Sequence, residues 1–520
     1  MKNKIYMFLC TVTLCVMVLP SCTKNFEKIN TDPINTPNAL PEQLLAPALV
    51  ATLSANMLRN RNFNNELMQV TVSQTDDEAA IFRYDYRNTI SDNLYNNWYA
   101  QLTNFKDVYR IASQPLTLNK SYQGISLICQ AWIYSLLTDT YGDVPYSQSN
   151  LGRDSSLYEP AFDKQKDIYT SLFSQLEAAN TLLTTGTAIK ATSDPVYNGN
   201  VSKWRKFGNS LYLRLLLKLS GKAEVATDVI AKIKDMVDTR ASTYPKFASN
   251  DDSAILRWTG GVYTSPYQLV REQDWRSPAI GSFFIDHLRD WADPRININI
   301  YATSGFNRWS IAQGPSGFAG VASGYLPGTG APKQSYFYSN TSAVSLQTDQ
   351  LTGMIMNYGE LQFILAECSL KGYIATGTAQ TYWETGVLSG LTLWLPTWPN
   401  AVAAGPPATP TTTATAEFRA YLTNADINWD NTESVDAKME RIHLQKYYAL
   451  FLEDLQQWFE YRRTNHPTLP VGTGLRNGGV MPARMTYPVY VQSANPTNYK
   501  LAVATQGPDV ISTQVWWQKP

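Results

Sequence analysis

The sequence predicts a mostly α-helical fold, in which pairs of long helices form a scaffold and long irregular loops form a ligand-binding face. Apolar residues recur at intervals near 3.6 through most of the chain, which is the period of a helix with one buried side. This rhythm stops in two stretches rich in glycine, proline and small polar residues, at about 240–350 and 393–415. We therefore expect one helical domain over residues 41–520 that carries both stretches as insertions.

An apolar stripe identifies each expected helix. Leu94, Trp98 and Leu102 recur every fourth residue and place Trp98 in the core. The stripes predict three pairs of neighbouring helices, at 92–113 with 121–139, 163–184 with 201–220, and 355–371 with 380–392. In the third pair, Leu365 to Tyr373 is similar to the turn of a tetratricopeptide helix pair, although no strict 34-residue period is visible. We therefore expect tetratricopeptide-like pairs with diverged repeats.

One further helix is expected near the end of the chain, from about Val435 to Arg463. Its apolar residues again share one face. Arg462 and Arg463 would lie at its negative carboxyl end, and Pro467 would prevent its continuation. We expect a single long helix here.

The N-terminus has the pattern of an export signal for a lipoprotein. Two lysines precede an apolar run at 5–19. This run is too short to span a bilayer as a helix, for which about 20 apolar residues are needed. The run ends in Leu-Pro-Ser-Cys, so we expect cleavage of residues 1–21 and lipid attachment to Cys22. An ordinary signal peptide cut nearby is the alternative. Residues 22–40 would then form a lipidated tether.

Charge and cysteine content exclude some functions of the mature chain. Without residues 1–21, 41 basic residues face 43 acidic ones, which gives no electrostatic basis for binding nucleic acid. No other stretch is long and apolar enough to cross a membrane. Only Cys129 and Cys368 remain beyond Cys22, each within a helical pattern, and we expect two buried free thiols rather than a disulfide.

Catalytic and metal-binding motifs are missing from the sequence, and we expect no enzyme activity, no metal and no cofactor. The three histidines, His287, His443 and His466, lack the spacing of shared metal ligands. Acidic clusters at 76–78 and 251–252 could in principle form a glycosidase pair or a calcium site. Adjacent acids more often form a solvated surface or a cap, which is the interpretation we favour.

Aromatic loop residues are the candidates for ligand binding. An uncharged sugar is bound by stacking on Trp or Tyr rings and by hydrogen bonds from Arg, Asn, Asp or Gln. Two loop regions offer these side chains, one before the Trp98 helix and one within the insertion at 240–350. The predicted ligand-binding residues are Arg83, Tyr84, Tyr86, Trp275, Arg276 and Trp309. The alternative is that these rings seal the loops onto the scaffold.

Seven motifs in order along the chain resemble those of SusD-like (SusD/RagB) proteins. They are Cys22 to Pro33, Tyr141 to Tyr146, Trp204 to Leu211 with Arg214, Asp293 to Arg295, Met356 to Glu367, Gln445 to Thr464 with Pro467, and Met481 to Arg484 with Tyr487-Pro488. Two positions depart from the family pattern, since Gly208 and Gly359 stand where alanine is usual. The resemblance covers nearly the whole mature chain.

This resemblance implies a capture lipoprotein that catalyses nothing. It implies four tetratricopeptide-like helix pairs, a loop-rich ligand face, and oligosaccharide or, in some members, peptide ligands. It also implies a SusC-like TonB-dependent transporter as partner, on which the protein sits as a hinged lid at the outer membrane. The lid is expected to face the cell exterior. Most motif residues have a structural role in this interpretation, with Arg462, Arg463 and Glu367 in ion pairs and caps of the scaffold.

Three classes of function remain to be distinguished. A binding lipoprotein explains the signal, the neutral charge, the loops and the motifs. An extracellular glycoside hydrolase would need a catalytic acid pair, and it would degrade a polymer that a binding protein leaves intact. A ligand-free helical-repeat adaptor would explain the helices but not the aromatic loops. We favour the binding protein.

Overall fold

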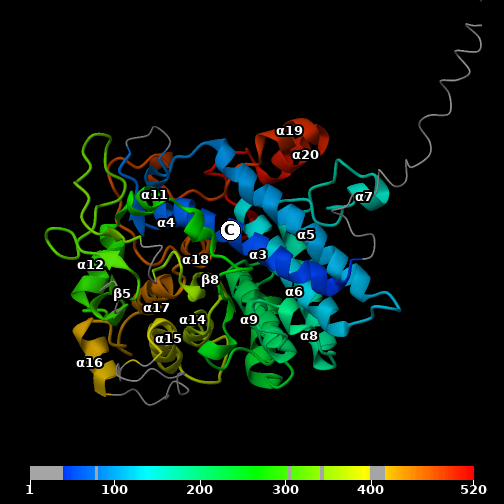
Figure 1. Ribbon diagram of the computed structural model, residues 1–520, viewed down its shortest axis with the longest axis horizontal. Coiled ribbons are helices and arrows are strands. Elements are labelled where there is room, and N and C mark those ends of the chain that lie inside the picture. Colours follow the sequence, from blue (N-terminus) through cyan, green and yellow to red (C-terminus); the bar gives the residue numbers. More distant parts are fainter. Residues whose placement is uncertain are drawn as a thin grey trace, which may run out of the picture.

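A computed structural model describes residues 39–75, 80–301, 306–339, 345–396, 398 and 416–519. Helices make up most of this part of the chain, and the few strands are short (Figure 1). The predicted mostly α-helical fold is therefore confirmed. Among the described residues, no helix has the length and apolar character needed to span a membrane. Cys22 and the rest of the expected signal and tether up to residue 38 lie outside the described residues.

The first block of helices contains two of the predicted pairs. It consists of α3 (Pro41–Arg59), α5 (Asp92–Ala112), α6 (Lys120–Tyr141), α8 (Gln165–Thr184) and α9 (Val201–Leu219). Each of these helices packs against the next one in this order (Figure 1). Helix α6 begins after Asn119, whose side chain accepts hydrogen bonds from the backbone N–H groups of Ser121 and Tyr122. Sequence periodicity and a capping side chain thus agree on the start of α6.

The second block contains the third predicted pair. Helices α14 (Tyr358–Leu370) and α15 (Ala379–Trp394) pack against each other, and both contact α17 (Val435–Ala449). Helix α14 also contacts α9, which joins the second block to the first. Gly359 allows α14 and α15 to lie close together, because a Cβ atom there would lie 3.2 Å from the carbonyl oxygen of Gly386. The departure from alanine at Gly359 therefore has a structural reason.

The predicted single helix from Val435 to Arg463 is wrong. The chain forms α17 and then α18 (Gln456–Thr464), with a break between them. Within the break, Leu452 and Asp454 have positive φ angles of 72° and 29°, which are unfavourable in a continuous helix. The break turns Glu453 and Asp454 into the protein interior, where both are buried. Tertiary contacts of these acids therefore outweigh the local helical pattern.

The insertion at 240–350 contains only short helices and short strands in its described part. The predicted short helix near 281–291 is α12 (Ser282–Asp290), flanked by α11 (Glu272–Arg276) and α13 (Pro294–Asn297). Four antiparallel two-stranded sheets are described, and they pair β1 (Thr71–Val72) with β3 (Ala279–Ile280), β2 (Ala254–Leu256) with β8 (Gly353–Met356), β4 (Asn299–Tyr301) with β5 (Phe306–Asn307), and β6 (Ile311–Ala312) with β7 (Tyr336–Phe337). Two of these pairings, β1 with β3 and β2 with β8, join the insertion to strands that lie outside it. Most of the second insertion, 393–415, lies outside the described residues.

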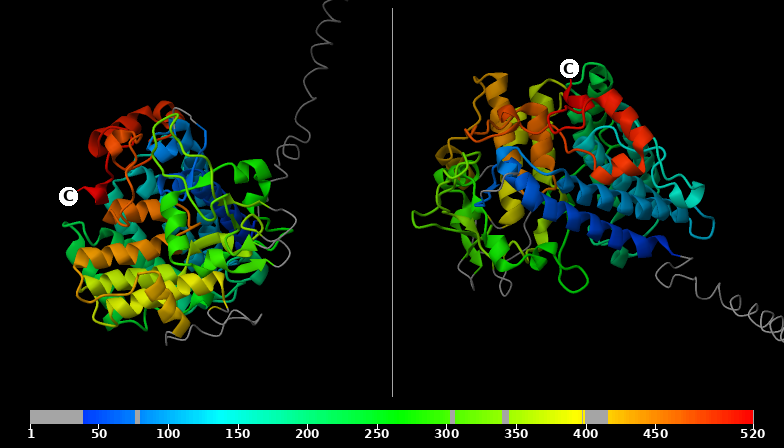
Figure 2. Two further views of the ribbon diagram at one scale, coloured as in Figure 1. Left: turned by 90° about the vertical axis from the view of Figure 1, so that its left-hand side faces the viewer. Right: turned by 90° about the horizontal axis from the view of Figure 1, so that it is seen from above.

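The remaining helices are shorter than those of the two blocks. They include α4 (Asn65–Leu67), α7 (Gly152–Ser155), α10 (Ala226–Lys234), α16 (Ala416–Asn424), α19 (Val489–Ala494) and α20 (Pro496–Gln506). Helix α7 and the pair α19–α20 lie on the same side of α5 (Figures 1 and 2).

A π-helical turn, η1 (Asn60–Asn64), follows α3. The Asn60 side chain donates a hydrogen bond of 2.8 Å to the backbone oxygen of Asp454, and the Asn64 side chain donates one of 2.7 Å to the side-chain oxygen of Gln457. These bonds tie the end of α3 to the segment in which α18 begins.

One large apolar core runs through both blocks. Trp98, Trp132 and Trp204 are fully buried in it, as the stripe analysis predicts for Trp98. Cys129 and Cys368 are buried free thiols, which confirms that expectation. At Gly208 an added Cβ would lie 2.7 Å from a methyl carbon of Ile128, so the neighbouring helix already fills the space that alanine would take.

Two buried ion-pair networks join separate segments of the core. Arg214 of α9 donates hydrogen bonds to Glu360 of α14 at 2.7 and 2.5 Å and a further one to Glu453 in the break before α18. Arg463 of α18 bonds to Glu367 of α14 at 2.7 and 2.6 Å, which confirms the ion pair expected for these two residues. Arg462 differs, because it donates hydrogen bonds to the backbone carbonyl groups of Ala483 and Asp139 rather than to a carboxylate.

Candidate functional site

The predicted tyrosines and Trp309 lie on loops, as expected, but their rings point into the protein. Tyr84 and Tyr86 are 4% and 6% exposed, and the Tyr86 hydroxyl donates a hydrogen bond to the carbonyl of Arg484. Trp309 is fully buried, and the guanidinium of Arg295 lies 4.5 Å from its ring centre. These rings seal the loops onto the scaffold in this structure.

The two predicted arginines also hold loops together. Arg83 is buried, and its Nε donates a hydrogen bond of 2.9 Å to the carbonyl of Tyr325. Arg276 keeps about a third of its side-chain surface exposed, lies 4.8 Å from the ring centre of Tyr338 and bonds to the carbonyl of Ser339. Of the six predicted residues, Arg276 therefore retains the most accessible side chain.

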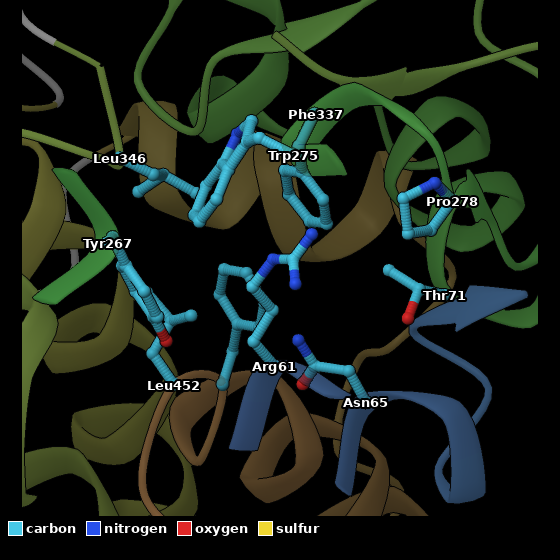
Figure 3. Close-up of a pocket in the computed structure, with 10 residues that line it drawn as sticks. Arg61, Asn65, Thr71, Tyr267, Trp275, Pro278, Phe337, Leu346 and Leu452 are labelled. Atoms are coloured by element: carbon cyan, nitrogen blue, oxygen red, sulfur yellow. The ribbon is translucent and has the colours of Figure 1, made fainter. Parts of the chain in front are cut away.

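Trp275 lines a small closed pocket between the insertion and the end of the first helix. Figure 3 shows the guanidinium of Arg61 in this pocket between Trp275, Tyr267 and Asn65. The Trp275 indole N–H, the Asn65 side-chain oxygen and the Thr71 hydroxyl have no hydrogen-bond partner within the described protein. The free volume of about 20 Å³ suits one water molecule and is too small for a sugar ring. The six predicted residues thus do not form one open site, and their contact with a ligand stays a prediction.

A larger hollow with suitable chemistry lies where α5, the segment after α7, and α19 meet. We call it the tyrosine cleft. Its volume is about 330 Å³, which is within the range of small-ligand sites. It is lined by Tyr95, Asn96, Tyr99, Pro145, Ser149, Asn150, Gly152, Leu157, Tyr158, Pro160, Phe162, Tyr490, Val491, Ala494 and Asn495. Aromatic rings and side-chain amides therefore dominate its surface.

Helix α5 supplies the buried part of the tyrosine cleft. Tyr95 and Tyr99 are one helical turn apart, and their ring centres lie 4.7 Å from each other. The Tyr99 hydroxyl donates a hydrogen bond of 2.7 Å to the carbonyl of Pro145. Asn150 donates one of the same length to the carbonyl of Tyr99, and its side-chain oxygen remains without a partner in the described protein. These contacts fix the orientation of the rings and leave one buried acceptor available.

Two exposed rings complete the tyrosine cleft. Tyr158 is 76% exposed and packs over Gly152, where an added Cβ would lie 3.2 Å from the ring. Tyr490 of α19 is 42% exposed and donates its hydroxyl hydrogen to Asn96 of α5. Such rings offer apolar faces on which a ligand can stack.

The tyrosine cleft contains no charged side chain among its lining residues in the described chain. Burial, together with the negative charge of Asp92, raises the pKa of Tyr490 to about 12, and burial raises those of Tyr95 and Tyr99 above their usual range. All three phenols are therefore neutral at physiological pH. Neutral rings, amides and hydroxyls suit an uncharged polyhydroxylated ligand.

Of the two acidic clusters noted in the sequence, the structure describes the one at 251–252. In this cluster Asp252 pairs with Lys206 at 2.8 Å and accepts a hydrogen bond from the backbone N–H of Ala248, as in a structural cap. Residues 76–78 lie outside the described residues. Glu367, His443 and Glu460 lie close enough to share a metal ion. Their carboxylates are nevertheless paired with Arg463, and we interpret this cluster as part of the scaffold.

Sequence reasoning missed the tyrosine cleft. The spacing of Tyr95 and Tyr99 indicates one helix face, and Pro145 lies within the motif Tyr141 to Tyr146. Tyr158 and Tyr490, however, are separated by more than three hundred residues, and no local pattern brings them together. Only the packing of α19 beside α5 places these rings in one cleft.

The family is shown by a model described as "Starch-binding associating with outer membrane", which matches residues 33–488. The chain belongs to the SusD-like family. This SusD-like match extends over most of the sequence and includes six of the seven motifs in full, together with Pro33, the last residue of the first motif. It ends before Tyr490 and Asn495, so part of the tyrosine cleft lies beyond the matched region.

Solved structures show the same SusD-like fold. A SusD homologue from Bacteroides uniformis superposes with a TM-score of 0.73 at 22% identity, covering 93% of this chain and 100% of its own. A chitin-binding SusD homologue from Flavobacterium johnsoniae gives 0.73 at 20% identity, with 92% and 98% covered. A further chitin-binding protein gives 0.70 at 23% identity, with 93% and 100% covered. No curated protein sequence matches the chain.

Proposed function

We propose that this SusD-like protein is a non-catalytic capture lipoprotein that binds a neutral oligosaccharide in the tyrosine cleft and delivers it to a SusC-like TonB-dependent transporter. The observation that carries the binding site is the cleft itself, which combines exposed tyrosine rings with amides and lacks charge. A sugar ring has an apolar face for stacking and hydroxyl groups for hydrogen bonds, so this lining matches its chemistry.

The family and its relatives support the class of ligand. The family description names starch binding and the outer membrane, and two relatives of the same fold are named as chitin-binding. Starch and chitin are both built from sugar rings without net charge in their common forms. We therefore propose a neutral oligosaccharide first, and keep a peptide as the second ligand class to be tested.

Membrane attachment and transport are further parts of the proposal. The lipid on Cys22 would hold the protein at the outer membrane, with its body facing the cell exterior. Support comes from the signal pattern and the family description. Co-purification with a TonB-dependent barrel from detergent-treated outer membranes, and loss of the protein from intact cells treated with an external protease, would test both points.

Calorimetric titration of the purified protein with starch fragments, chitin fragments and short peptides tests the binding site. We expect Tyr158→Ala and Tyr490→Ala each to weaken binding of the oligosaccharide between about threefold and tenfold, because each removes one stacking ring. Tyr109→Ala is the matched control, since Tyr109 is a 37% exposed tyrosine of α5 outside the cleft. It should leave the affinity unchanged.

The alternatives give different results in the same experiment. If Trp275→Ala and Arg276→Ala weaken binding and the cleft variants do not, the ligand binds at the loop residues predicted from the sequence. Release of shorter sugars from a polymer would show a glycoside hydrolase. Binding of peptides alone would replace the ligand class, and a protein that binds neither class while retaining its fold would contradict the capture function.

A further inference from the structure

A second large hollow has the opposite chemistry of the tyrosine cleft. It lies where the carboxyl ends of α9, α14 and α18 meet the chain after residue 479, and its volume is about 770 Å³. We call it the basic cleft. Its lining contains five cationic side chains, Lys218, Lys371, Arg462, Arg463 and Lys519, and no aspartate or glutamate among the described residues.

Three carboxylates behind the lining neutralise part of this charge. Lys218 pairs with Asp139 at 2.5 Å. Lys371 and Arg463 share Glu367, at 2.7 and 2.6 Å. These pairs belong to the scaffold, because the carboxylates involved are buried.

Glu460, the third carboxylate, is shared as well. It accepts hydrogen bonds from Arg463 at 2.8 Å and from Lys446 at 2.7 Å. Six cations, counting Lys446 with the five of the lining, therefore face three carboxylates within this part of the described chain. The negative ends of three helices offset roughly half a charge each, which leaves the cleft with a positive excess.

Arg462 and Lys519 carry this excess. Arg462 donates to the carbonyl groups of Ala483 and Asp139, the latter at 2.7 Å, and its Nε has no hydrogen-bond partner in the described protein. Lys519 donates to the carbonyl of Gln506 at 2.6 Å. Neither forms an ion pair with a carboxylate of the described chain. Burial, offset in part by the negative charge of Asp139, lowers the pKa of Arg462 to about 9.

Neutral hydrogen-bonding groups surround these two cations. The side chains of Asn465, Ser512 and Gln514 line the cleft, are exposed and make no hydrogen bond of their own within the described chain. They are free to bind hydroxyl or amide groups of a ligand, while the cations bind an oxyanion. The volume exceeds what an inorganic ion needs and is in the range of an oligosaccharide site.

We propose that the basic cleft binds the carboxylate or sulfate group of an acidic oligosaccharide at Arg462 and Lys519, with sugar hydroxyls bonded to Asn465 and Gln514. That the ligand is an oligosaccharide rests on the proposed function, whereas its negative charge is inferred from the excess of cations in the cleft alone. The protein would then have two sites of different selectivity, one for neutral and one for acidic sugars.

Titration of the purified protein with a uronic acid trisaccharide, a sulfated trisaccharide and a neutral trisaccharide tests this inference. We expect at least one acidic trisaccharide to bind, and its affinity to fall as salt rises from about 0.02 to about 0.3 M. Lys519→Gln should weaken that binding about tenfold, because it removes a charge-assisted hydrogen bond. Lys500→Gln, which removes an exposed lysine of α20 outside the cleft, should not.

The arms of the experiment separate the possible failures. Inorganic sulfate as a competitor should displace the acidic ligand from the unaltered protein. Acidic binding that Lys519→Gln leaves unchanged overturns the inference, as does a protein that binds neither acidic trisaccharide. Binding of the neutral sugar, weakened by Tyr158→Ala and unaffected by Lys519→Gln, would show that the proposed function holds even when this inference fails.

Discussion

Replacing Arg214 with methionine should destabilise the protein more than any other single change discussed above. Arg214 is 2% exposed, and Glu360 and Glu453, its two partners, are fully buried. Methionine keeps much of the side-chain volume but leaves two buried glutamate side chains without the guanidinium that bonds to both. Removal of one partner from a buried ion pair costs about 3–5 kcal/mol, which is a large fraction of the 5–15 kcal/mol typical of protein stability. Urea unfolding followed by tryptophan fluorescence would measure the loss.

Glu453→Gln is the matched control for this prediction. Burial and the neighbouring Glu360 raise the pKa of Glu453 well above its usual range, which favours the protonated form of this side chain. Glutamine resembles the protonated acid, and we expect a loss below about 1 kcal/mol. A cost as large as that of Arg214→Met would refute the reasoning, as would a nearly unchanged Arg214→Met variant.

The sign of the pH dependence provides a second check on the same network. A raised folded pKa means that the stability due to Glu453 is fully present below its unfolded pKa of about 4.5. It is lost as pH rises toward and through the folded pKa. We therefore expect the unfolding midpoint of the unaltered protein to fall relative to that of Glu453→Gln as pH rises above about 4.5.

Four further predictions concern binding, pH, anchoring and packing. Affinity for a neutral oligosaccharide should stay constant from about pH 5 to about pH 9 in calorimetry, because no lining group of the tyrosine cleft titrates there. The hydrogen bond to Glu440 raises the pKa of His466 in the folded protein. The stabilisation from this pair is therefore full below about pH 6.5 and is lost as pH rises through the pKa of the folded state. Thermal unfolding should show that His466→Gln costs less stability at high pH than at low pH. Cys22→Ser should move the protein from the membrane to the soluble fraction, and mass spectrometry should find no lipid. Gly359→Ala should cost about 1–3 kcal/mol in urea unfolding, since the new methyl group would press on the carbonyl of Gly386; a stabilised variant would contradict this packing.

Helices were predictable from the sequence because their signal is local. The stripe of Leu94, Trp98 and Leu102 reports burial of one face, and that face is buried in α5. The break between α17 and α18 was not predictable in the same way. It depends on the pairing of Glu453 with Arg214, whose positions differ by 239 residues.

The site was less predictable, because exposure of a loop aromatic depends on what packs against it. Trp309 and Tyr86 occur in loops with the composition of a binding face, yet Arg295 covers one ring and the Arg484 segment accepts the hydroxyl of the other. Tyr490, in contrast, lies in a short helix near the end of the chain and remains exposed. Residue type identified the chemistry of stacking, and only tertiary packing decided which rings could perform it.

The side-chain bonds of η1 have a consequence for the order of folding. Asn60 and Asn64 meet partners 394 and 393 residues further along the chain. The first helix therefore cannot reach its final environment until nearly all of the protein has been synthesised. Contacts of such long sequence separation slow folding and leave apolar surface exposed in the meantime. If the chain leaves the cytoplasm with its N-terminus first, its first segments must stay unfolded outside the cytoplasm until the later segments arrive. We expect the protein to depend on a chaperone in that compartment.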